Sequence, residues 1–371
     1  MLSYIIWNGS PEIFSIWIFS LRWYGLLFAL GFLISQQLLY YMHRQEGKPE
    51  KDVDTLTIYM IVATIIGARL GHIIFYEPAM LWQDPLGVLL PFRFSPFHFT
   101  GFTGLASHGG AIAILFALWL YSRKKKPGQS YLQILDRIVI LIFLTAGLIR
   151  LGNYFNSEII GKPTDSPMGV LFVNDVTARI SQNEDNTNPM AGIEIKREEK
   201  KEVTENGRVP IDIYIFFKSG TTENQATSFL TWNVKSALAQ SSDFIDEPNA
   251  PLNYQLSLEP SGTYAARVKT TGIVRHPAQL YESISCFLLF AFFFWYWSRY
   301  KNNLPEGRIF GWFMIILWGL RFSYEFLKEN QVAFEDNLTL NMGQTLSIPL
   351  ILIGIVVLIR SYKKKSESSK A

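Results

Sequence analysis

The stretch R-L-G-N-Y-F-N-S-E-I-I-G, from Arg150 to Gly161, continues an apolar run that begins at Ile134 and is long enough for a membrane-spanning helix. Within nine positions it carries Arg150, Asn153, Asn156 and Glu158. On a continuing helix Arg150 and Asn153 lie about 60° apart, so they share one face. A guanidinium in hydrocarbon costs about 3 kcal/mol on insertion scales, and a partner or a ligand must offset this cost. Two interpretations remain open: a buried Arg–Glu pair that fixes helix packing, or a pocket for an anionic lipid headgroup.

The composition indicates a membrane protein. The chain has 371 residues, of which 49% are hydrophobic and 15% aromatic. Several apolar runs are about 20 residues long, which predicts a polytopic helical protein because open sheets cannot satisfy their backbone groups in lipid. The single cysteine, Cys286, excludes a disulfide within the chain and a CxxC metal site. The first residues carry no basic segment and no small-residue cleavage site, so we expect no removable signal peptide.

Seven apolar segments are candidates for membrane-spanning helices. They cover approximately residues 21–42, 55–76, 105–121, 134–154, 278–297, 309–327 and 345–361. Residues 11–20 are apolar and aromatic, and we expect them to form an arm along the membrane interface. The fold class predicted from this pattern is an all-α polytopic membrane protein with seven transmembrane helices.

The basic residues predict how the chain is oriented. Lys and Arg gather after the first, third and fifth predicted helices and in the C-terminal tail, for example at Arg123–Lys126 and Lys363–Lys365. Cytoplasmic connections carry such an excess, so we expect the N-terminus outside and the C-terminus in the cytoplasm. The tail from Lys363 to Ala371 is predicted to be a disordered basic end.

The one long connection divides the chain into three parts. Residues 1–161 hold the interfacial arm and the first four predicted helices, and residues 273–371 hold the last three helices and the basic tail. Residues 162–272 are predicted to form a small extracytoplasmic α+β insert. Its β-like segments cover residues 192–198, 209–218 and 264–270, and a helix-like run covers 223–240.

A group of charged, polar and aromatic residues at or near the ends of the predicted helices falls in the outer half of the membrane. It comprises Arg22, Tyr24, Arg69, His72, His108, Arg150, Arg275, His276, Gln279, Glu282, Arg321 and Glu325. Polar residues gathered at one depth in lipid indicate a functional site, here one that is reached from the outer leaflet.

The residue types favour a phosphate ligand. A guanidinium matches phosphate oxygens and keeps its charge. His108 can accept a proton near neutral pH, or it can serve as a hydrogen-bonding group in helix packing. Arg321 and Glu325 are spaced as a pair within one helix, and Gln279 with Glu282 could join helices. The His, Cys and acidic residues lack the spacing of a metal site, so we expect no metal and no cofactor.

Several motifs, in one order, resemble the prolipoprotein diacylglyceryl transferase family of bacterial membranes. They are R-W-Y-G-L from Arg22, G-A-R-L-G from Gly67, S-H-G-G from Ser107, R-L-G-N-Y-F-N-S-E-I-I-G from Arg150, R-H-P-A-Q-L-Y-E from Arg275, R-F-S-Y-E-F from Arg321 and N-M-G-Q-T-L-S-I-P from Asn341. The chain departs from the family pattern at Ser157, where Gly is usual, and at Ile160, where Trp is usual. Residues 163–272 form a longer segment than typical members have.

The resemblance implies transfer of the sn-1,2-diacylglyceryl group of phosphatidylglycerol to the lipobox cysteine of a preprolipoprotein. A thioether forms and glycerol phosphate leaves. The implied location is the bacterial inner membrane, with the active site facing the outer leaflet, and no nucleic acid is a partner. The alternatives are a transporter, which would show paired sites and two related halves, and a non-catalytic lipid- or lipoprotein-binding protein.

For this reaction we assign His108, Arg150 and Arg321 as catalytic residues, with the arginines on the phosphate and His108 removing the thiol proton or only positioning the headgroup. The residues expected to bind phosphatidylglycerol are Tyr24, Arg69, Gly109, Arg150, Asn153, Asn156 and Glu158. Those expected to support the site are His276, Gln279, Glu282 and Glu325.

Overall fold

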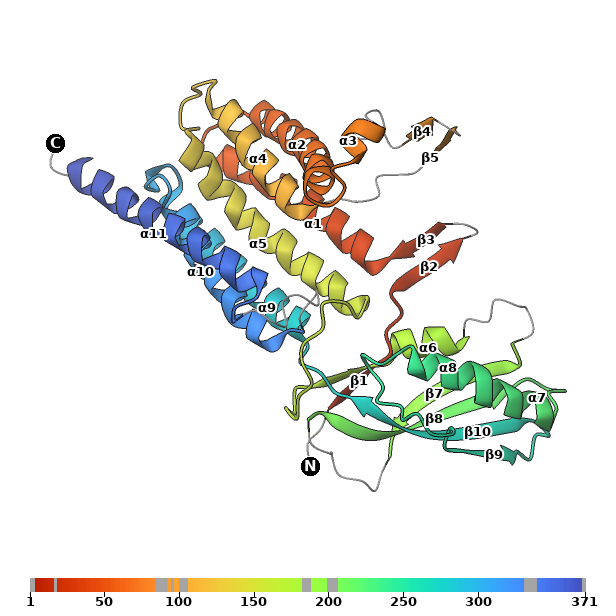
Figure 1. Cartoon of the computed structure of the whole chain (residues 1–371). Coiled ribbons are helices and arrows are strands. Elements are labelled where there is room, and N and C mark those ends of the chain that lie inside the picture. Colours follow the sequence, from red (N-terminus) through yellow and green to blue (C-terminus); the bar gives the residue numbers. More distant parts are fainter. Residues whose placement is uncertain are drawn as a thin grey trace. The chain divides into compact units, whose positions relative to one another are not determined.

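The computed structural model describes residues 4–16, 19–84, 92–94, 97–99, 106–181, 188–198, 206–329 and 339–368 (Figure 1). The chain forms two compact units, each built from three stretches. The first unit holds Met1–Ala29, Gly147–Ser285 and Leu320–Thr345. The second unit holds Leu30–Ala146, Cys286–Gly319 and Leu346–Ala371.

The structure is predominantly helical. Its long helices are α1 (Trp23–Gln45), α2 (Lys51–Tyr76), α4 (Ser107–Ser122), α5 (Tyr131–Phe155), α9 (Ala278–Tyr300), α10 (Arg308–Tyr324) and α11 (Met342–Ser368). Five of them, α1, α2, α5, α9 and α11, are long and apolar enough to cross a membrane. Helices α4 and α10 coincide with the other two predicted spans but have 16 and 17 residues. These helices define a multi-pass membrane protein.

Both ends of the helical part differ from the sequence prediction. The arm predicted along the interface includes two antiparallel strands, β2 (Glu12–Ile16) and β3 (Phe19–Arg22), so Arg22 ends a strand and the first helix starts at Trp23. The tail predicted to be disordered is helical as far as Ser368, because Lys, Glu and Ser permit the helix to continue. Residues 369–371, and Leu105 at the start of the third predicted span, lie outside the described residues.

Close contact between α2 and α4 shapes part of the second unit. A Cβ on Gly109 would lie 2.7 Å from Cα of Gly71, and a Cβ on Gly67 would lie 2.7 Å from the carbonyl oxygen of Gly109. The two backbones touch because these positions have no side chain. Gly109, which the sequence assigned to ligand binding, thus serves helix packing in the structure.

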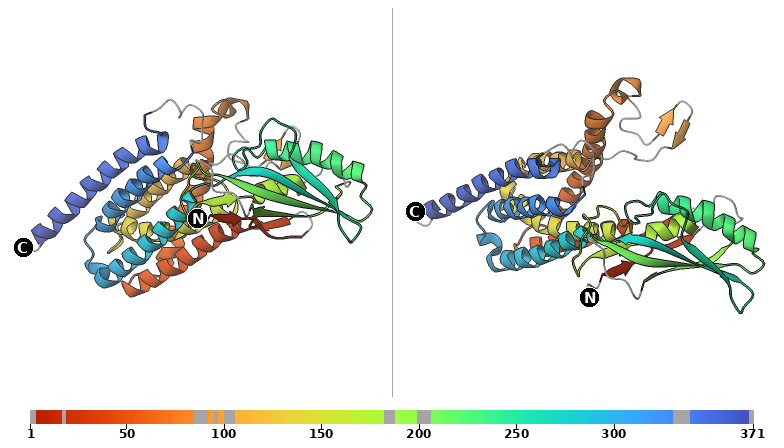
Figure 2. Two further views of the ribbon diagram at one scale, coloured as in Figure 1. Left: turned by 90° about the horizontal axis from the view of Figure 1, so that it is seen from below. Right: turned by 60° about the horizontal axis from the view of Figure 1, so that its bottom comes forward.

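The first unit contains an antiparallel sheet in the order β7-β8-β10-β9. Its strands are β7 (Met190–Arg197), β8 (Arg208–Phe217), β9 (Tyr254–Leu258) and β10 (Tyr264–Ile273). The helical elements beside it are α6 (Asn174–Ser181), α7 (Glu223–Ser228), the π-helical turn η1 (Phe229–Val234) and α8 (Lys235–Ala239), which lie on one face of the sheet (Figure 2). Three strands and the helical run agree with the β-like and helix-like segments read from the sequence.

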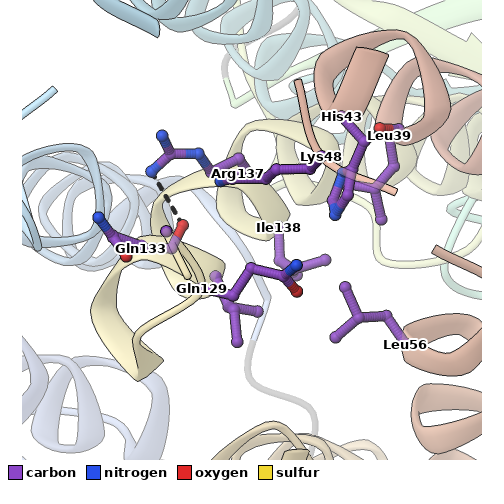
Figure 3. A pocket seen from close by; sticks show the side chains of 10 residues that line it. Leu39, His43, Lys48, Leu56, Gln129, Gln133, Arg137 and Ile138 are labelled. Atoms are coloured by element: carbon purple, nitrogen blue, oxygen red, sulfur yellow. Dashed lines mark hydrogen bonds between the residues drawn. The ribbon is translucent and has the colours of Figure 1, made fainter. Parts of the chain in front are cut away.

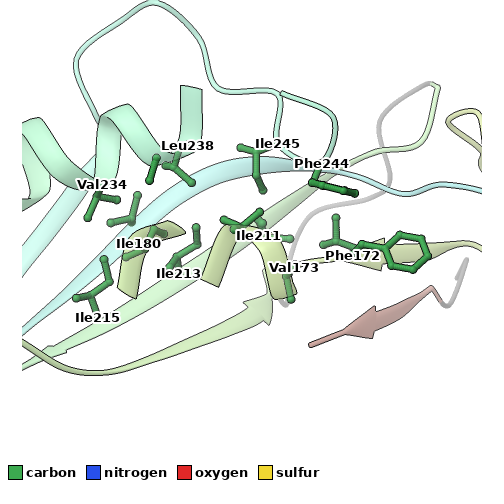
Figure 4. Packing of buried hydrophobic residues seen from close by; sticks show 14 of the residues in the cluster. Phe172, Val173, Ile180, Ile211, Ile213, Ile215, Val234, Leu238, Phe244 and Ile245 are labelled. Carbon is green, nitrogen blue, oxygen red and sulfur yellow. The ribbon is translucent and has the colours of Figure 1, made fainter. Parts of the chain in front are cut away.

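Alternation along β8 explains this packing. Val209, Ile211, Ile213, Ile215 and Phe217 are buried, and they form a core with Phe172, Ile180, Val234 and Leu238 (Figure 4). Side chains two apart on a strand point to one face, so this row meets the helices.

A second, two-stranded sheet adds the N-terminus to the first unit. Strand β1 (Ile5–Trp7) pairs in parallel with β6 (Val170–Phe172), with Ile5 opposite Val170. The remaining short elements are α3 (Met80–Gln83), β4 (Phe92–Phe94), β5 (Phe97–Phe99) and the 3-10 turns η2 (Lys301–Asn303) and η3 (Glu325–Leu327).

Candidate functional site

Arg150 lies in the last two turns of α5 and is held by a carboxylate from α9. Its Nε lies 2.5 Å from Oε2 of Glu282, and the side chains are 23% and 11% exposed. Within the part of the chain that the structure describes, Glu282 is the one ion-pair partner of Arg150. The closest contact of the carboxylate is with Nε, and among the described residues the two terminal amino groups of Arg150 donate no hydrogen bond.

Lys328 connects this pair to a second carboxylate. Its ammonium group contacts Oε1 of Glu282 and lies 3.4 Å from Oε1 of Glu325, and its side chain is only 4% exposed. Buried cations need such partners, because an unpaired charge in the interior is costly. Lys328 was not among the residues selected from the sequence.

The last pair of the group lies at the end of α10. Nε of Arg321 is 3.8 Å from Oε1 of Glu325, which confirms the pair expected from their spacing, and Asn341 donates a hydrogen bond of 3.0 Å to Oε2 of Glu325. Cations and carboxylates thus alternate in the order Arg150, Glu282, Lys328, Glu325, Arg321, and we call these five residues the charged chain. Chain segments far apart in sequence meet there.

Glu158 has amide partners. Asn153 and Asn156 donate hydrogen bonds of 2.7 and 3.2 Å to its Oε1, and Gln279 donates one of 2.6 Å to its backbone carbonyl. The structure thus brings Asn153, Asn156, Glu158 and Gln279 together. Their contribution to substrate binding remains a prediction.

The carboxylate beside Arg150 is Glu282 from α9 and not the nearby Glu158, which a buried Arg–Glu pair within this stretch would have used. Helix α5 ends at Phe155, and the chain then turns through positive φ values of 53° at Ser157 and 57° at Ile159. Glu158 is thereby carried back toward the amides of its own segment, and Glu282 takes its place beside Arg150.

Arg275 and His276 hold the segment just before α9 in place through hydrogen bonds. Arg275 is 5% exposed and donates hydrogen bonds to the carbonyls of Gly161 and Asp243 at 3.1 and 2.6 Å. The Nδ1 atom of His276 lies 3.3 Å from the hydroxyl of Tyr281, and burial lowers the pKa of this imidazole. Both residues hold the segment that leads to Glu282.

Tyr24 lies against α5 at Gly152, two residues after Arg150. A Cβ on Gly152 would lie 2.9 Å from Cα of Tyr24, and the ring of Trp23 stacks on Phe155 with centroids 4.9 Å apart. The start of α1 is therefore fixed to the end of α5, within the first unit.

Three further candidates belong to the second unit. Arg69 is 8% exposed, with Nη2 3.7 Å from the sulfur of Met80, and His72 Nε2 lies 3.5 Å from Glu77. His108 is exposed and meets the ring of Phe75 with centroids 5.0 Å apart. Among the described residues no side chain hydrogen-bonds to His108.

A small cavity of about 10 Å³ lies elsewhere in the second unit. His43, Lys48, Gln129, Gln133 and Arg137 line it together with aliphatic side chains (Figure 3). It has room for about one water molecule. None of the residues predicted for the site lines it. Among the described residues there is also no group of three His, Cys or acidic side chains that could hold a metal ion.

The helices and the charged chain describe a multi-pass membrane protein with a partly buried cationic site. The model of the prolipoprotein diacylglyceryl transferase family matches residues 11–360, and the chain belongs to this family. The resemblance read from the motifs is thereby confirmed.

Three curated relatives match over almost their whole length. A phosphatidylglycerol–prolipoprotein diacylglyceryl transferase of Bacteroides fragilis is 32% identical over 369 residues, which are 99% of this chain and 98% of the relative. Proteins of the same name from Chloroherpeton thalassium and Tolumonas auensis are 33% and 29% identical, over 98% of this chain and 96% and 99% of their own. The long segment 163–272 thus falls within the stretches matched.

Proposed function

We propose that this protein transfers the diacylglyceryl group of phosphatidylglycerol to the cysteine thiol of a preprolipoprotein lipobox. The bond between the glyceryl carbon and the phosphate oxygen breaks, a thioether forms at that carbon, and glycerol phosphate leaves with the bonding electrons. Family membership and the names of the relatives support this reaction.

The observation that carries the proposal is the way in which Arg150 is held. Glu282 occupies Nε, so the two terminal amino groups can donate to two oxygens of one phosphate. The attacked carbon is not activated, so much of the rate enhancement has to come from stabilising the charge that develops on the departing phosphate. A fixed guanidinium in a partly buried site does this without reorganising during the reaction.

The rest of the charged chain keeps Arg150 in position. Glu282 faces two cations, Arg150 and Lys328, and Glu325 faces Lys328 and Arg321. Each carboxylate is therefore compensated and each cation has a fixed neighbour. We assign Lys328 as a positioning residue, and Arg321 as the second residue on the phosphate.

The thiol also has to lose its proton. A free cysteine has a pKa of about 8.5, so the thiolate is a minor species at neutral pH unless a base or a positive field favours it. His108 is our candidate for the base, with Arg150 and Arg321 supplying the field. The alternative role of His108 is to position the headgroup of phosphatidylglycerol.

The same proposal includes the placement of the chain in the bacterial inner membrane. Helices α1, α2, α4, α5, α9, α10 and α11 form seven spans, with the N-terminus outside, the basic loops inside, and residues 162–272 outside. The distribution of Lys and Arg supports this orientation. The substrate then enters from the outer leaflet.

Incubation of the purified full-length protein with phosphatidylglycerol and a lipobox peptide tests the function. Mass spectrometry should show a peptide that has gained one diacylglyceryl group, and a matched peptide with serine in place of the cysteine should stay unmodified. A peptide that binds with lipid but keeps its mass would instead support a binding protein. Movement of lipid across a vesicle without modification of the peptide would support a transporter.

A further inference from the structure

Arg308, the first residue of α10, is buried without a partner for one side of its guanidinium. It is 6% exposed, and it forms no ion pair among the described residues. Its Nε and Nη2 atoms each expose less than 1 Å² and have no hydrogen-bond partner. A buried charged group in this condition is costly, so an acceptor from outside the chain is expected at this place.

The nearby buried carboxylate does not serve Arg308. Asp136 of α5 accepts hydrogen bonds from the backbone N–H groups of Gly307 and Phe310, at 2.7 and 2.8 Å. It satisfies donors at the first turn of α10, where backbone N–H groups lack partners within the helix. The carboxylate is engaged in this cap, and the guanidinium edge stays unsatisfied.

The two unpaired atoms define the shape of the missing acceptor. Nε–H and the Nη2 amino group lie on the same edge of a guanidinium and point in parallel, which suits two oxygens of one phosphate. The ring of Tyr362 in α11 lies under the guanidinium, 4.1 Å from Cζ to centroid. This stacking fixes the plane of the guanidinium and leaves its Nε and Nη2 edge without an acceptor.

A second unpaired group comes from the neighbouring helix. Ser361 is 3% exposed and its hydroxyl has no hydrogen-bond partner. Helices α10 and α11 touch closely here, since a Cβ on Gly307 would lie 3.0 Å from Val357, one turn before Ser361. The exposed Arg360 and Lys363 lie on the same end of α11 and add positive charge.

We propose that Arg308, Ser361 and Tyr362 form a binding site for a phosphate group, either the headgroup of an anionic phospholipid or free phosphate. The guanidinium edge donates two hydrogen bonds, the serine hydroxyl donates a third, and the tyrosine ring holds the arginine. The edge is covered in the structure, so the phosphate enters by displacing a neighbouring side chain. No residue of this site belongs to the charged chain, and the inference does not depend on the proposed reaction.

Equilibrium binding of radiolabelled dioleoyl phosphatidic acid to the full-length protein in detergent tests the site. We expect Arg308→Gln to lose one bound lipid, or to bind it about tenfold to a hundredfold more weakly, because two charge-assisted hydrogen bonds disappear. The matched control is Arg360→Gln, which removes an exposed charge from the same end of α11 and should bind like the parent protein. Unlabelled phosphatidylcholine should not compete.

Competition separates the two sources of the phosphate. If free phosphate is the ligand, inorganic phosphate displaces the lipid that depends on Arg308, and if the lipid is the ligand, only phosphatidic acid does. Arg308→Lys keeps the charge but loses the paired edge, and it should also bind weakly, which covers the case that Arg308→Gln fails to fold. The proposal is overturned if a folded Arg308 variant binds phosphatidic acid as well as the parent protein does. It is also overturned if the parent protein binds phosphatidic acid and phosphatidylcholine equally.

Discussion

Nε of Arg150 lies 2.5 Å from Oε2 of Glu282, and among the described residues the two terminal amino groups of this guanidinium donate no hydrogen bond. A carboxylate that only neutralised the arginine could equally sit on those terminal groups. With the closest contact at Nε, the end of the guanidinium that we propose to bind phosphate stays available.

Lys328→Met should lower both stability and transfer. The substitution leaves Glu282 and Glu325 with one cation fewer in a site where the Lys328 side chain is 4% exposed. Breaking a buried pair by removing one partner costs about 3–5 kcal/mol. Denaturation in detergent and the peptide transfer assay measure the two effects.

Lys328→Arg is the matched control for this prediction, because it keeps the positive charge. The Lys328→Arg protein should retain most of the parent's stability. Its transfer rate should fall only as far as the larger arginine shifts Glu282. A Lys328→Met protein with the parent's stability and rate would exclude Lys328 from the positioning of Arg150.

Labelling of introduced cysteines should place Lys125 inside and Glu223 outside. Lys125 is exposed in the basic connection between α4 and α5, and Glu223 is exposed at the start of α7. Cytoplasmic loops carry the excess of Lys and Arg, so a membrane-impermeant maleimide should label only the residue at position 223 in intact spheroplasts. The one native cysteine, Cys286, is buried and can be replaced by alanine beforehand.

Permeabilised spheroplasts provide the control, because both positions should then react. Labelling at position 125 in intact spheroplasts would reverse the orientation and remove the argument that the site opens to the outer leaflet.

Stability should fall in mild acid, partly through His276. Burial lowers the pKa of this imidazole below its ordinary value of 6.5, so the unfolded chain binds its proton more readily than the folded protein does. The contribution of His276 is complete above pH 6.5 and is lost as the pH falls toward the lower pKa of the folded state. We expect the midpoint of thermal unfolding to drop more steeply from pH 7 to pH 5 in the parent protein than in His276→Asn. Parallel curves for the two proteins would contradict this assignment.

The sequence predicts well those features that depend on local pattern. Apolar runs located the long helices, and alternation located β7, β8 and β10, because burial of one strand face imposes a period of two. Strands β1 and β6 have three residues each and pair across a long separation, so no local pattern marks them.

The site illustrates the same limit. Arg321 and Glu325 were paired correctly from their spacing, since neighbours on one helix are fixed by its geometry. The partner of Arg150 depends on the turn at Ser157 and Ile159, two residues without glycine's preference for positive φ. Lys328 directly follows the sixth predicted span, where a lysine usually anchors the helix at the interface, and only the fold shows that it is buried.

Arg150→Lys should reduce transfer about a hundredfold or more, the scale of losing one fixed donor to a developing charge. Lysine keeps the charge and can still pair with Glu282, but it lacks the two parallel amino groups. Thermal unfolding in detergent should stay close to that of the parent protein, which separates lost chemistry from misfolding.

If Arg150 only neutralises Glu282, lysine should replace it with near-normal turnover. In that case Arg150→Gln combined with Glu282→Gln should also retain activity, because neither charge is left unpaired and Lys328 keeps Glu325. A stable, active double variant would therefore move Arg150 from the phosphate to the scaffold and leave Arg321 as the leading phosphate ligand.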